Sequence, residues 1–211
     1  MVTVFDLDDT LYDEIDFVKS GFLEIASTIS DTPEEPFKFM WNIFLHEGSG
    51  SIFNQLIQHF HLTITLESLI TQYRTHTPNI ILSDETMALL NVAKSLGSTA
   101  LITDGMSKMQ TKKYDALGLS QWIDYPVFTD LYNTHKPEPL AFEMVMHHFA
   151  SETKFVYLSD NPKKDFFAPN QLDWLTIRYK NPQGIYRDVP SNAKYEITSH
   201  MEAIPLLQDY S

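Results

Sequence analysis

The stretch Val2-Thr3-Val4-Phe5-Asp6-Leu7-Asp8-Asp9-Thr10 begins as a short apolar run and ends in a cluster of carboxylates. Its first residues are typical of a buried β-strand. In open α/β sheets, ligands bind in the crevice outside the carboxyl ends of the strands. The acidic cluster therefore predicts an active site at the end of this first strand.

Two of these carboxylates raise an electrostatic problem that a cation would solve. Asp6 and Asp8 are two residues apart, so an extended chain places both on one side. Like charges at that spacing repel unless a cation or a shared proton compensates them, and Mg²⁺ prefers hard oxygen ligands. A simple acidic turn that caps the next helix explains Asp9 or Asp13, but it does not explain the whole cluster.

Composition and charge restrict the class of protein. The chain has 211 residues, 43% of them hydrophobic, which suits one sizeable core or a core with a small insert. A net charge of -13 disfavours nucleic acid and anionic membranes as partners. The sequence has no cysteine, which excludes disulfides, thiolate nucleophiles and cysteine-based metal sites. No secretory leader and no apolar run of about 20 residues is visible, so we expect a cytoplasmic protein that is a monomer or homodimer.

Hydrophobic spacing divides the chain into two kinds of segment. Between residues 14 and 77 apolar residues recur at helical spacing, with breaks near 31–33, 48–50 and 61–63, which predicts about four helices. From residue 84 onward, strand-like and helical patterns alternate, which favours a parallel, doubly wound sheet. We therefore predict an α/β, Rossmann-like core formed by residues 1–13 and 84–211, with an α-helical cap of residues 14–83 inserted into it. The predicted strands after the first are 99–103, 125–129, 155–158, 174–177 and 195–198, and the predicted helices between them include 84–96, 107–117 and 138–149.

Three further polar segments follow predicted strands or precede helices of this core. They are Thr103-Asp104-Gly105, His135-Lys136-Pro137, and the segment from Ser159 to Asp165 with Asp160 near its start. Alone, the first is equally typical of a turn and helix cap, a lysine such as Lys136 is more often a solvated surface charge, and the third could again be a helix cap. Together they favour a shared site, because a hydroxyl, a lysine and a carboxylate each occur where the crevice beyond the first strand would need that type of residue.

These motifs, in this order, resemble those of the haloacid dehalogenase superfamily phosphohydrolases that carry a helical cap of the C1 type. The segment from Asp6 to Thr10 matches the Asp-x-Asp-x-Thr signature, and Thr103 matches the second motif. Lys136 matches the third, and Asp160 with Asp165 the fourth, so the resemblance covers nearly the whole chain. Two residues depart from the pattern: Asp104 stands where an Asn is common, and Ser159 replaces the usual Gly.

The resemblance implies a role for each motif residue. Asp6 is the expected nucleophile, forming an aspartyl-phosphate, and Asp8 is the expected acid and base. Thr103 and Lys136 are expected to hold the phosphoryl oxygens, while Mg²⁺ uses the Asp6 carboxylate, the Asp8 backbone carbonyl and Asp160. Asp165 is expected to orient Lys136 or a metal-bound water. The full predicted sets are Asp6, Asp8, Asp160 and Asp165 for the metal and Thr10, Thr103, Asp104 and Lys136 for the phosphate.

The expected function is Mg²⁺-dependent hydrolysis of a small phosphomonoester, such as a sugar phosphate, an acyl-sugar phosphate or a nucleoside monophosphate. A phosphomutase of the same superfamily uses the same acids and stays open as an alternative. A dehalogenase needs no second aspartate, so Asp8 favours phosphoester chemistry. Outside the superfamily, a phosphoaccepting receiver-like domain conflicts with the order of the motifs, and an inactive binding module conflicts with the presence of every motif residue.

Overall fold

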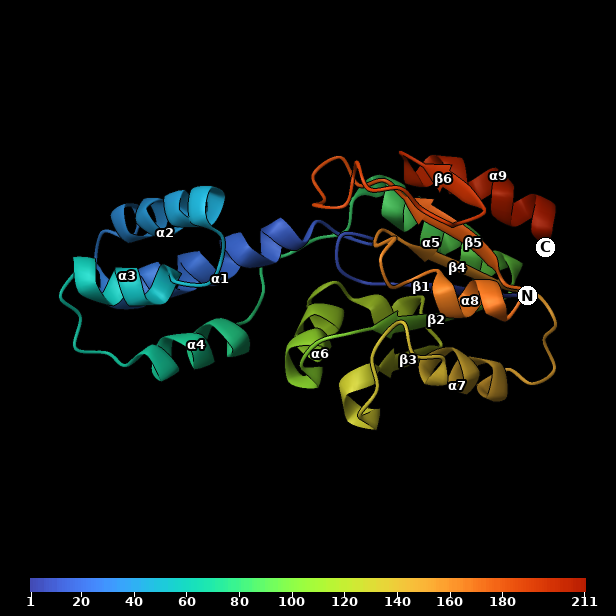
Figure 1. Ribbon diagram of the computed structural model, residues 1–211, viewed down its shortest axis with the longest axis horizontal. Coiled ribbons are helices and arrows are strands. Elements are labelled where there is room, and N and C mark those ends of the chain that lie inside the picture. Colours follow the sequence, from blue (N-terminus) through green and yellow to red (C-terminus); the bar gives the residue numbers. More distant parts are fainter. The chain divides into compact units, whose positions relative to one another are not determined.

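The computed structural model describes all 211 residues and contains two compact units (Figure 1). The first unit consists of Met1–Glu14 and Ile81–Ser211, and the second of Ile15–Ile80. No helix combines the length and the apolar character needed to span a bilayer.

The first unit is built on a six-stranded sheet with the order β3-β2-β1-β4-β5-β6, in which every pairing is parallel. The prediction of an α/β, doubly wound sheet with a helical insertion is confirmed. The fifth strand extends further than its apolar pattern indicates, because Arg178 continues the ladder opposite Ser159 with its side chain buried. The strands are β1 (Val2–Phe5), β2 (Ser98–Thr103), β3 (Tyr125–Phe128), β4 (Phe155–Ser159), β5 (Leu175–Tyr179) and β6 (Tyr195–Ile197).

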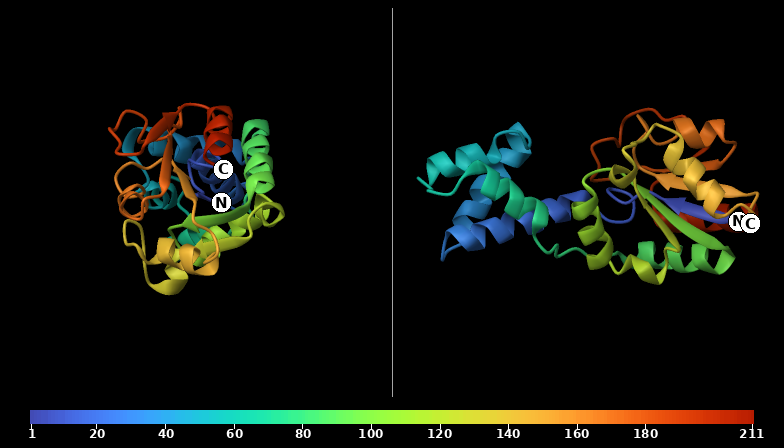
Figure 2. Two further views of the ribbon diagram at one scale, coloured as in Figure 1. Left: turned by 90° about the vertical axis from the view of Figure 1, so that its right-hand side faces the viewer. Right: turned by 90° about the horizontal axis from the view of Figure 1, so that it is seen from below.

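Helices cover both faces of this sheet, as Figure 2 shows. Val2, Val4 and Tyr157 pack with Phe142 of α7 and Ala168 of α8 on one face. On the other face α5 packs along α9. Strand residues buried from both sides read as continuous apolar runs, which is the pattern that the sequence shows. The helices of this unit are α5 (Asp84–Leu96), α6 (Ser107–Ala116), α7 (Leu140–His148), α8 (Phe167–Gln171) and α9 (His200–Tyr210).

The register of the central strands brings the predicted motifs to one edge of the sheet. Phe5 at the end of β1 lies opposite Leu101 of β2 and Leu158 of β4. The chain therefore leaves all three strands at nearly the same level. The chain order reverses around β1, so the edge beyond it is the crevice in which open α/β sheets bind ligands.

The second unit consists of helices that share one apolar core. Phe22 and Ile25 of α1 pack with Met40 of α2, Leu56 of α3 and Leu69 of α4. Thr65 caps α4 through its side chain, which accepts a hydrogen bond from the Ser68 N–H. The helices are α1 (Glu14–Ile29), α2 (Glu34–Glu47), α3 (Ile52–His59) and α4 (Leu66–Thr75), in agreement with the prediction of about four helices between residues 14 and 77.

Candidate active site

Asp6 lies directly beyond β1, where its backbone N–H donates to the Leu158 carbonyl oxygen at 3.0 Å. Its carboxylate contacts a buried lysine: Lys136 Nζ lies 2.6 Å from Asp6 Oδ1 and 3.1 Å from Asp165 Oδ1. Tyr157 Oη accepts a further hydrogen bond from the same ammonium at 3.1 Å. Burial lowers the pKa of Lys136, but Asp165 and Asp6 outweigh it and hold that pKa well above its usual range. The lysine is therefore a fixed positive charge beside Asp6.

Three buried carboxylates meet at this point. Asp6, Asp160 and Asp165 can each offer one oxygen, and those oxygens lie within 4.8 Å of one another. Burial, together with the neighbouring carboxylates, raises the pKa of Asp6 to about 6 and that of Asp160 to about 8. Lys136 alone therefore does not compensate the negative charge that Asp6 and Asp160 carry when ionised. Hard oxygen donors that lack compensating charge suit a divalent cation such as Mg²⁺, so the donor set fits the metal.

Asp8 is surrounded by hydrogen-bond donors rather than by carboxylates, although it follows Asp6 by only two residues. Its Oδ1 accepts hydrogen bonds from Lys113 Nζ at 2.7 Å and from Tyr12 Oη at 2.6 Å, and its Oδ2 accepts one from Gln110 Nε2 at 2.8 Å. Burial raises the pKa of Asp8, but the Lys113 charge and these donors outweigh burial and lower it overall. The Asp8 carboxylate is not one of the three clustered carboxylates, so its predicted metal contact stays limited to the backbone carbonyl.

Asp104 departs from the family pattern, and its carboxylate accepts hydrogen bonds from three groups. Its Oδ1 accepts from Thr129 Oγ1 at 2.9 Å and from the Lys136 N–H at 3.2 Å, and its Oδ2 accepts from Lys164 Nζ at 2.6 Å. Burial raises its pKa, and Lys136 and Lys164 lower it further than burial raises it. An amide could not accept at both positions, since its nitrogen only donates. Lys164 therefore compensates the charge that this departure introduces.

The loop after β4 is tied to the first acidic turn. Ser159 Oγ donates to Asp165 Oδ2 and lies 3.4 Å from Asp6 Oδ2. The Asp160 N–H donates to Thr10 Oγ1 at 3.1 Å. Thr10 is buried and its hydroxyl holds this loop, whereas its predicted contact with phosphate stays a prediction.

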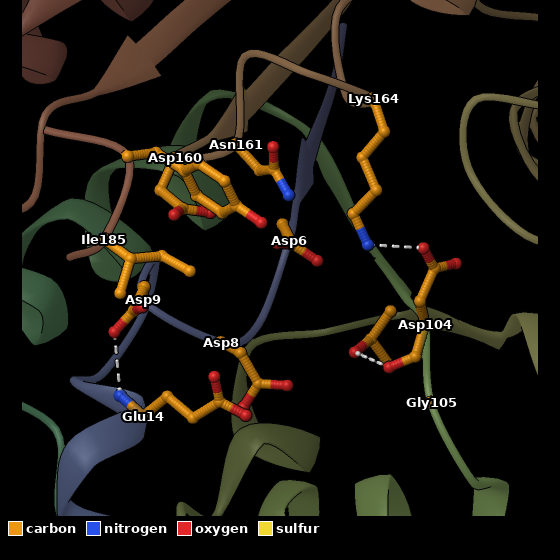
Figure 3. Close-up of a pocket in the computed structure, with 12 residues that line it drawn as sticks. Asp6, Asp8, Asp9, Glu14, Asp104, Gly105, Asp160, Asn161, Lys164 and Ile185 are labelled. Carbon is orange, nitrogen blue, oxygen red and sulfur yellow. Dashed lines mark hydrogen bonds and ion pairs between the residues drawn. The ribbon is translucent and has the colours of Figure 1, made fainter. Parts of the chain in front are cut away.

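A cavity of about 290 Å³ opens at this edge of the sheet (Figure 3). Of the predicted site residues, the structure brings Asp6, Asp8, Thr103, Asp104 and Asp160 to its wall. Lys136 and Asp165 reach the same place through their ion pairs with each other and with Asp6, while Thr10 does not line the cavity. The wall is formed by Asp6, Asp8, Asp9, Glu14, Thr103, Asp104, Gly105, Asp160, Asn161, Lys164, Ile185 and Tyr186.

Part of this wall comes from the irregular segment between β5 and β6. Buried Arg178 donates to the Tyr186 carbonyl oxygen, and Asn181 Nδ2 donates to the Asp9 carbonyl oxygen at 3.1 Å. These bonds hold the segment beside the acidic turn and bring Ile185 and Tyr186 to the cavity. Ile185 is 80% exposed, so this part of the wall is an apolar side chain open to solvent.

Sequence reasoning missed several polar residues of the site, among them Gln110, Lys113 and Lys164. Gln110 and Lys113 lie on α6 and contact Asp8, and Lys164 contacts Asp104. The available signal was spacing: Gln110 and Lys113 are three residues apart on a helix that begins just after Thr103, so they share one face. Lysines are usually solvated, however, and neither Lys113 nor Lys164 differs locally from a surface residue.

Comparison with known proteins identifies relatives of this chain. A family profile described as haloacid dehalogenase-like hydrolase matches residues 3–173. The glyceraldehyde 3-phosphate phosphatase of Methanocaldococcus jannaschii is 26% identical over 223 residues, covering 98% of this chain and 96% of the relative.

Solved structures show the same fold at lower identity. A candidate β-phosphoglucomutase of Thermotoga maritima superposes with a TM-score of 0.72 at 17% identity, covering 100% of this chain and 99% of that one. A candidate hydrolase of Bacillus subtilis, solved bound to magnesium, gives a TM-score of 0.69 at 17% identity, covering 98% of this chain and 97% of that one.

Proposed function

This chain belongs to the haloacid dehalogenase-like hydrolase family, and we propose that it is a magnesium-dependent phosphatase of a small phosphomonoester. The observation that carries the proposal is the pair of carboxylates with opposite environments. Asp6 lies against Lys136 and two further carboxylates, and Asp8 lies two residues on with its own donors. A nucleophile and a separate acid or base are what transfer of a phosphoryl group to a side chain requires.

The residues divide the reaction into two steps. In the first, an Asp6 oxygen attacks phosphorus and the bond from phosphorus to the leaving oxygen breaks. Asp8 enters this step protonated and gives that oxygen its proton, which the second step restores to Asp8 from water. In the second, water attacks the aspartyl-phosphate while Asp8 takes a proton from it, and orthophosphate leaves with the Asp6 carboxylate restored. Thr103 and Lys136 hold the phosphoryl oxygens throughout, because phosphoryl transfer depends mainly on positioning and on stabilisation of charge.

Asp6, Asp160 and Asp165 would hold the magnesium ion, with the Asp8 backbone carbonyl as the further ligand that the family pattern implies. Mg²⁺ supplies positive charge that allows the anionic nucleophile and the anionic substrate to approach and that stabilises the transferring group. The cluster of three carboxylates supports this assignment, since the raised pKa values of Asp6 and Asp160 reflect negative charge that lacks compensation.

The substrate is expected among small sugar phosphates. The relative from Methanocaldococcus jannaschii acts as a glyceraldehyde 3-phosphate phosphatase by its name, and it aligns with this chain over nearly its full length. A cavity of about 290 Å³ suits a phosphoryl group with a leaving group of a few carbon atoms rather than a polymer. Acyl-sugar phosphates and nucleoside monophosphates are the other candidates, and the helical cap would choose among them.

The test is release of orthophosphate from a panel of phosphorylated metabolites, headed by glyceraldehyde 3-phosphate, with Mg²⁺ and with excess EDTA. We expect turnover that needs the metal and that vanishes in Asp6→Asn, because an amide is a poor nucleophile and a weaker metal ligand. Asp115→Asn on the exposed side of α6 is the matched control and should keep full activity.

Turnover in excess EDTA, or turnover retained by Asp6→Asn, contradicts the proposal. Transfer of phosphate to a second sugar phosphate in place of water indicates a mutase. Mapping a beryllofluoride adduct to any residue other than Asp6 contradicts the assignment of the nucleophile.

A further inference from the structure

Helix α6 carries two buried polar side chains that contact the predicted motif residues Asp8 and Thr103. Gln110 and Lys113 are 1% and 0% exposed, whereas polar residues on helices of this kind usually face solvent. They are three residues apart and therefore share one face of the helix. Neither belongs to a motif that the proposed reaction has used so far.

Gln110 joins two groups to which the proposed reaction assigns different tasks. Its amide nitrogen donates to Thr103 Oγ1 at 2.6 Å and to Asp8 Oδ2 at 2.8 Å, which uses both of its protons. The Thr103 hydroxyl accepts from Gln110, so its own proton stays available for another acceptor. Its contact with the Asp104 carbonyl oxygen, at 3.5 Å, is long for a hydrogen bond. Gln110 therefore turns the Thr103 hydroxyl into a donor at the cavity wall.

Lys113 fixes the other oxygen of Asp8. Its Nζ lies 2.7 Å from Asp8 Oδ1 and 3.7 Å from Glu14 Oε1. Tyr12 Oη donates to the same Asp8 oxygen at 2.6 Å. With Gln110 on Oδ2, both oxygens of the carboxylate are held, which fixes the plane and direction of the whole group. A buried ammonium is costly without a partner, so this contact is built into the fold.

We propose that Gln110 and Lys113 are positioning residues for the phosphoryl transfer: they aim the Asp8 carboxyl group at the leaving oxygen and the Thr103 hydroxyl at the phosphoryl group. This inference rests on the proposed function. Proton delivery to a leaving oxygen depends on hydrogen-bond geometry, and a shift of about 1 Å can cost about 10²-fold in rate. The effect falls on substrates whose leaving group needs the proton.

The leaving group therefore provides the test. The leaving group of an alkyl phosphate such as glycerol phosphate is a strongly basic alkoxide unless it is protonated. The leaving group of p-nitrophenyl phosphate is a phenolate that is stable without a proton. We expect Lys113→Met to lower kcat/KM about 10²-fold for glycerol phosphate and less than about 10-fold for p-nitrophenyl phosphate. Gln110→Met should show the same selectivity and should also raise KM for both substrates, because Thr103 loses its orientation.

Two further measurements separate positioning from structural damage. In an Asp8→Asn background, Lys113→Met should add little further loss, since the group that it positions is already inactive. Lys108→Met, which makes the same chemical change on the exposed side of α6, should leave both substrates unaffected. Thermal unfolding and Mg²⁺-dependent beryllofluoride binding establish that each variant is folded, and Gln110→Met serves in place of Lys113→Met if that variant does not fold.

Equal losses on the two substrates, or a Lys113→Met loss that is additive with Asp8→Asn, would overturn the inference. Failure of the proposed function looks different, because the wild-type protein would then lack Mg²⁺-dependent turnover of either substrate. A wild-type protein that is active and depends on Asp6, combined with α6 variants that do not distinguish the leaving groups, contradicts the positioning role alone.

Discussion

The two units of this chain bury different kinds of side chain. In the first unit, six fully or nearly fully buried residues carry formal charge, whereas no buried residue of Ile15–Ile80 is an Asp, Glu, Lys or Arg. The core of the second unit is aliphatic and aromatic, with rings such as Phe22, Phe44 and Phe53 in edge contact. A packed apolar core depends on volume, while a buried charge cluster depends on each partner being present. The buried charged residues are Asp6, Lys113, Lys136, Asp160, Asp165 and Arg178.

The largest effect should come from removing the cation of that cluster. Lys136→Met leaves Asp6 and Asp165 without the ammonium that lies between them. We expect turnover to fall by about 10²- to 10³-fold, as for loss of a donor at a transferring group, and the free energy of unfolding to fall by about 3–5 kcal/mol. Kinetics and denaturant unfolding without metal measure the two effects. Lys108→Met, on an exposed lysine, is the control.

A smaller effect of another kind is expected in the second unit. Leu56 is fully buried among the helices of that unit, so Leu56→Ala should destabilise it by about 2–5 kcal/mol, whereas Leu56→Met should cost less than about 1.5 kcal/mol. Hydrogen exchange should show faster opening of Ile15–Ile80 with little change in the sheet of the first unit. Loss of Mg²⁺-dependent beryllofluoride binding in parallel would contradict this separation of chemistry from apolar packing.

The same contrast explains what could be predicted from the sequence. The sheet, its four-helix insertion and the motif residues were predictable because apolar periodicity and strand ends are local signals. Lys113 was not, because the carboxylate that makes its burial favourable, Asp8, is 105 residues away in sequence. Arg178 was not, because its partners lie in the irregular segment and the strand that follow β5, and only the folded chain brings them to its side chain. Arg178 also extends β5 past its apolar run, since backbone carbonyls of the following segment accept its protons. Burial of charge is a property of tertiary partners that local patterns do not contain.

A third prediction concerns the charge pair at the phosphate loop. Lys164→Met should leave the Asp104 carboxylate poorly compensated beside the bound phosphate and raise KM about three- to ten-fold, a modest effect because Lys164 is one-third exposed. Asp104→Asn combined with Lys164→Met should restore KM, since the amide oxygen can still accept from Thr129 and the Lys136 N–H. Steady-state kinetics of the two single variants and the double variant measure the coupling. Additive effects would show that the two residues act separately.

The smallest effect concerns pH and the carboxylates of the metal cluster. Asp160 and Asp6 have pKa values of about 8 and about 6 in the folded protein, both raised from 3.8 by burial and by neighbouring carboxylates. Between about pH 4 and pH 8 the folded protein therefore holds more protons at these groups than the unfolded chain does, so their contribution to stability is lost as pH rises through that window. Mg²⁺ binds the ionised carboxylates and should oppose this loss.

We therefore expect the Tm of the metal-free protein to fall by a few degrees between about pH 5.5 and pH 8.5, and Mg²⁺ to raise Tm more at the higher pH. Asp160→Asn removes the group with the larger shift, so it should flatten the metal-free pH dependence while weakening the response to Mg²⁺. Asp115→Asn, which changes an exposed carboxylate, should leave both curves unchanged. A larger Mg²⁺ effect at the lower pH would mean that the clustered carboxylates are already ionised without the metal, and that a charge other than Mg²⁺ compensates them.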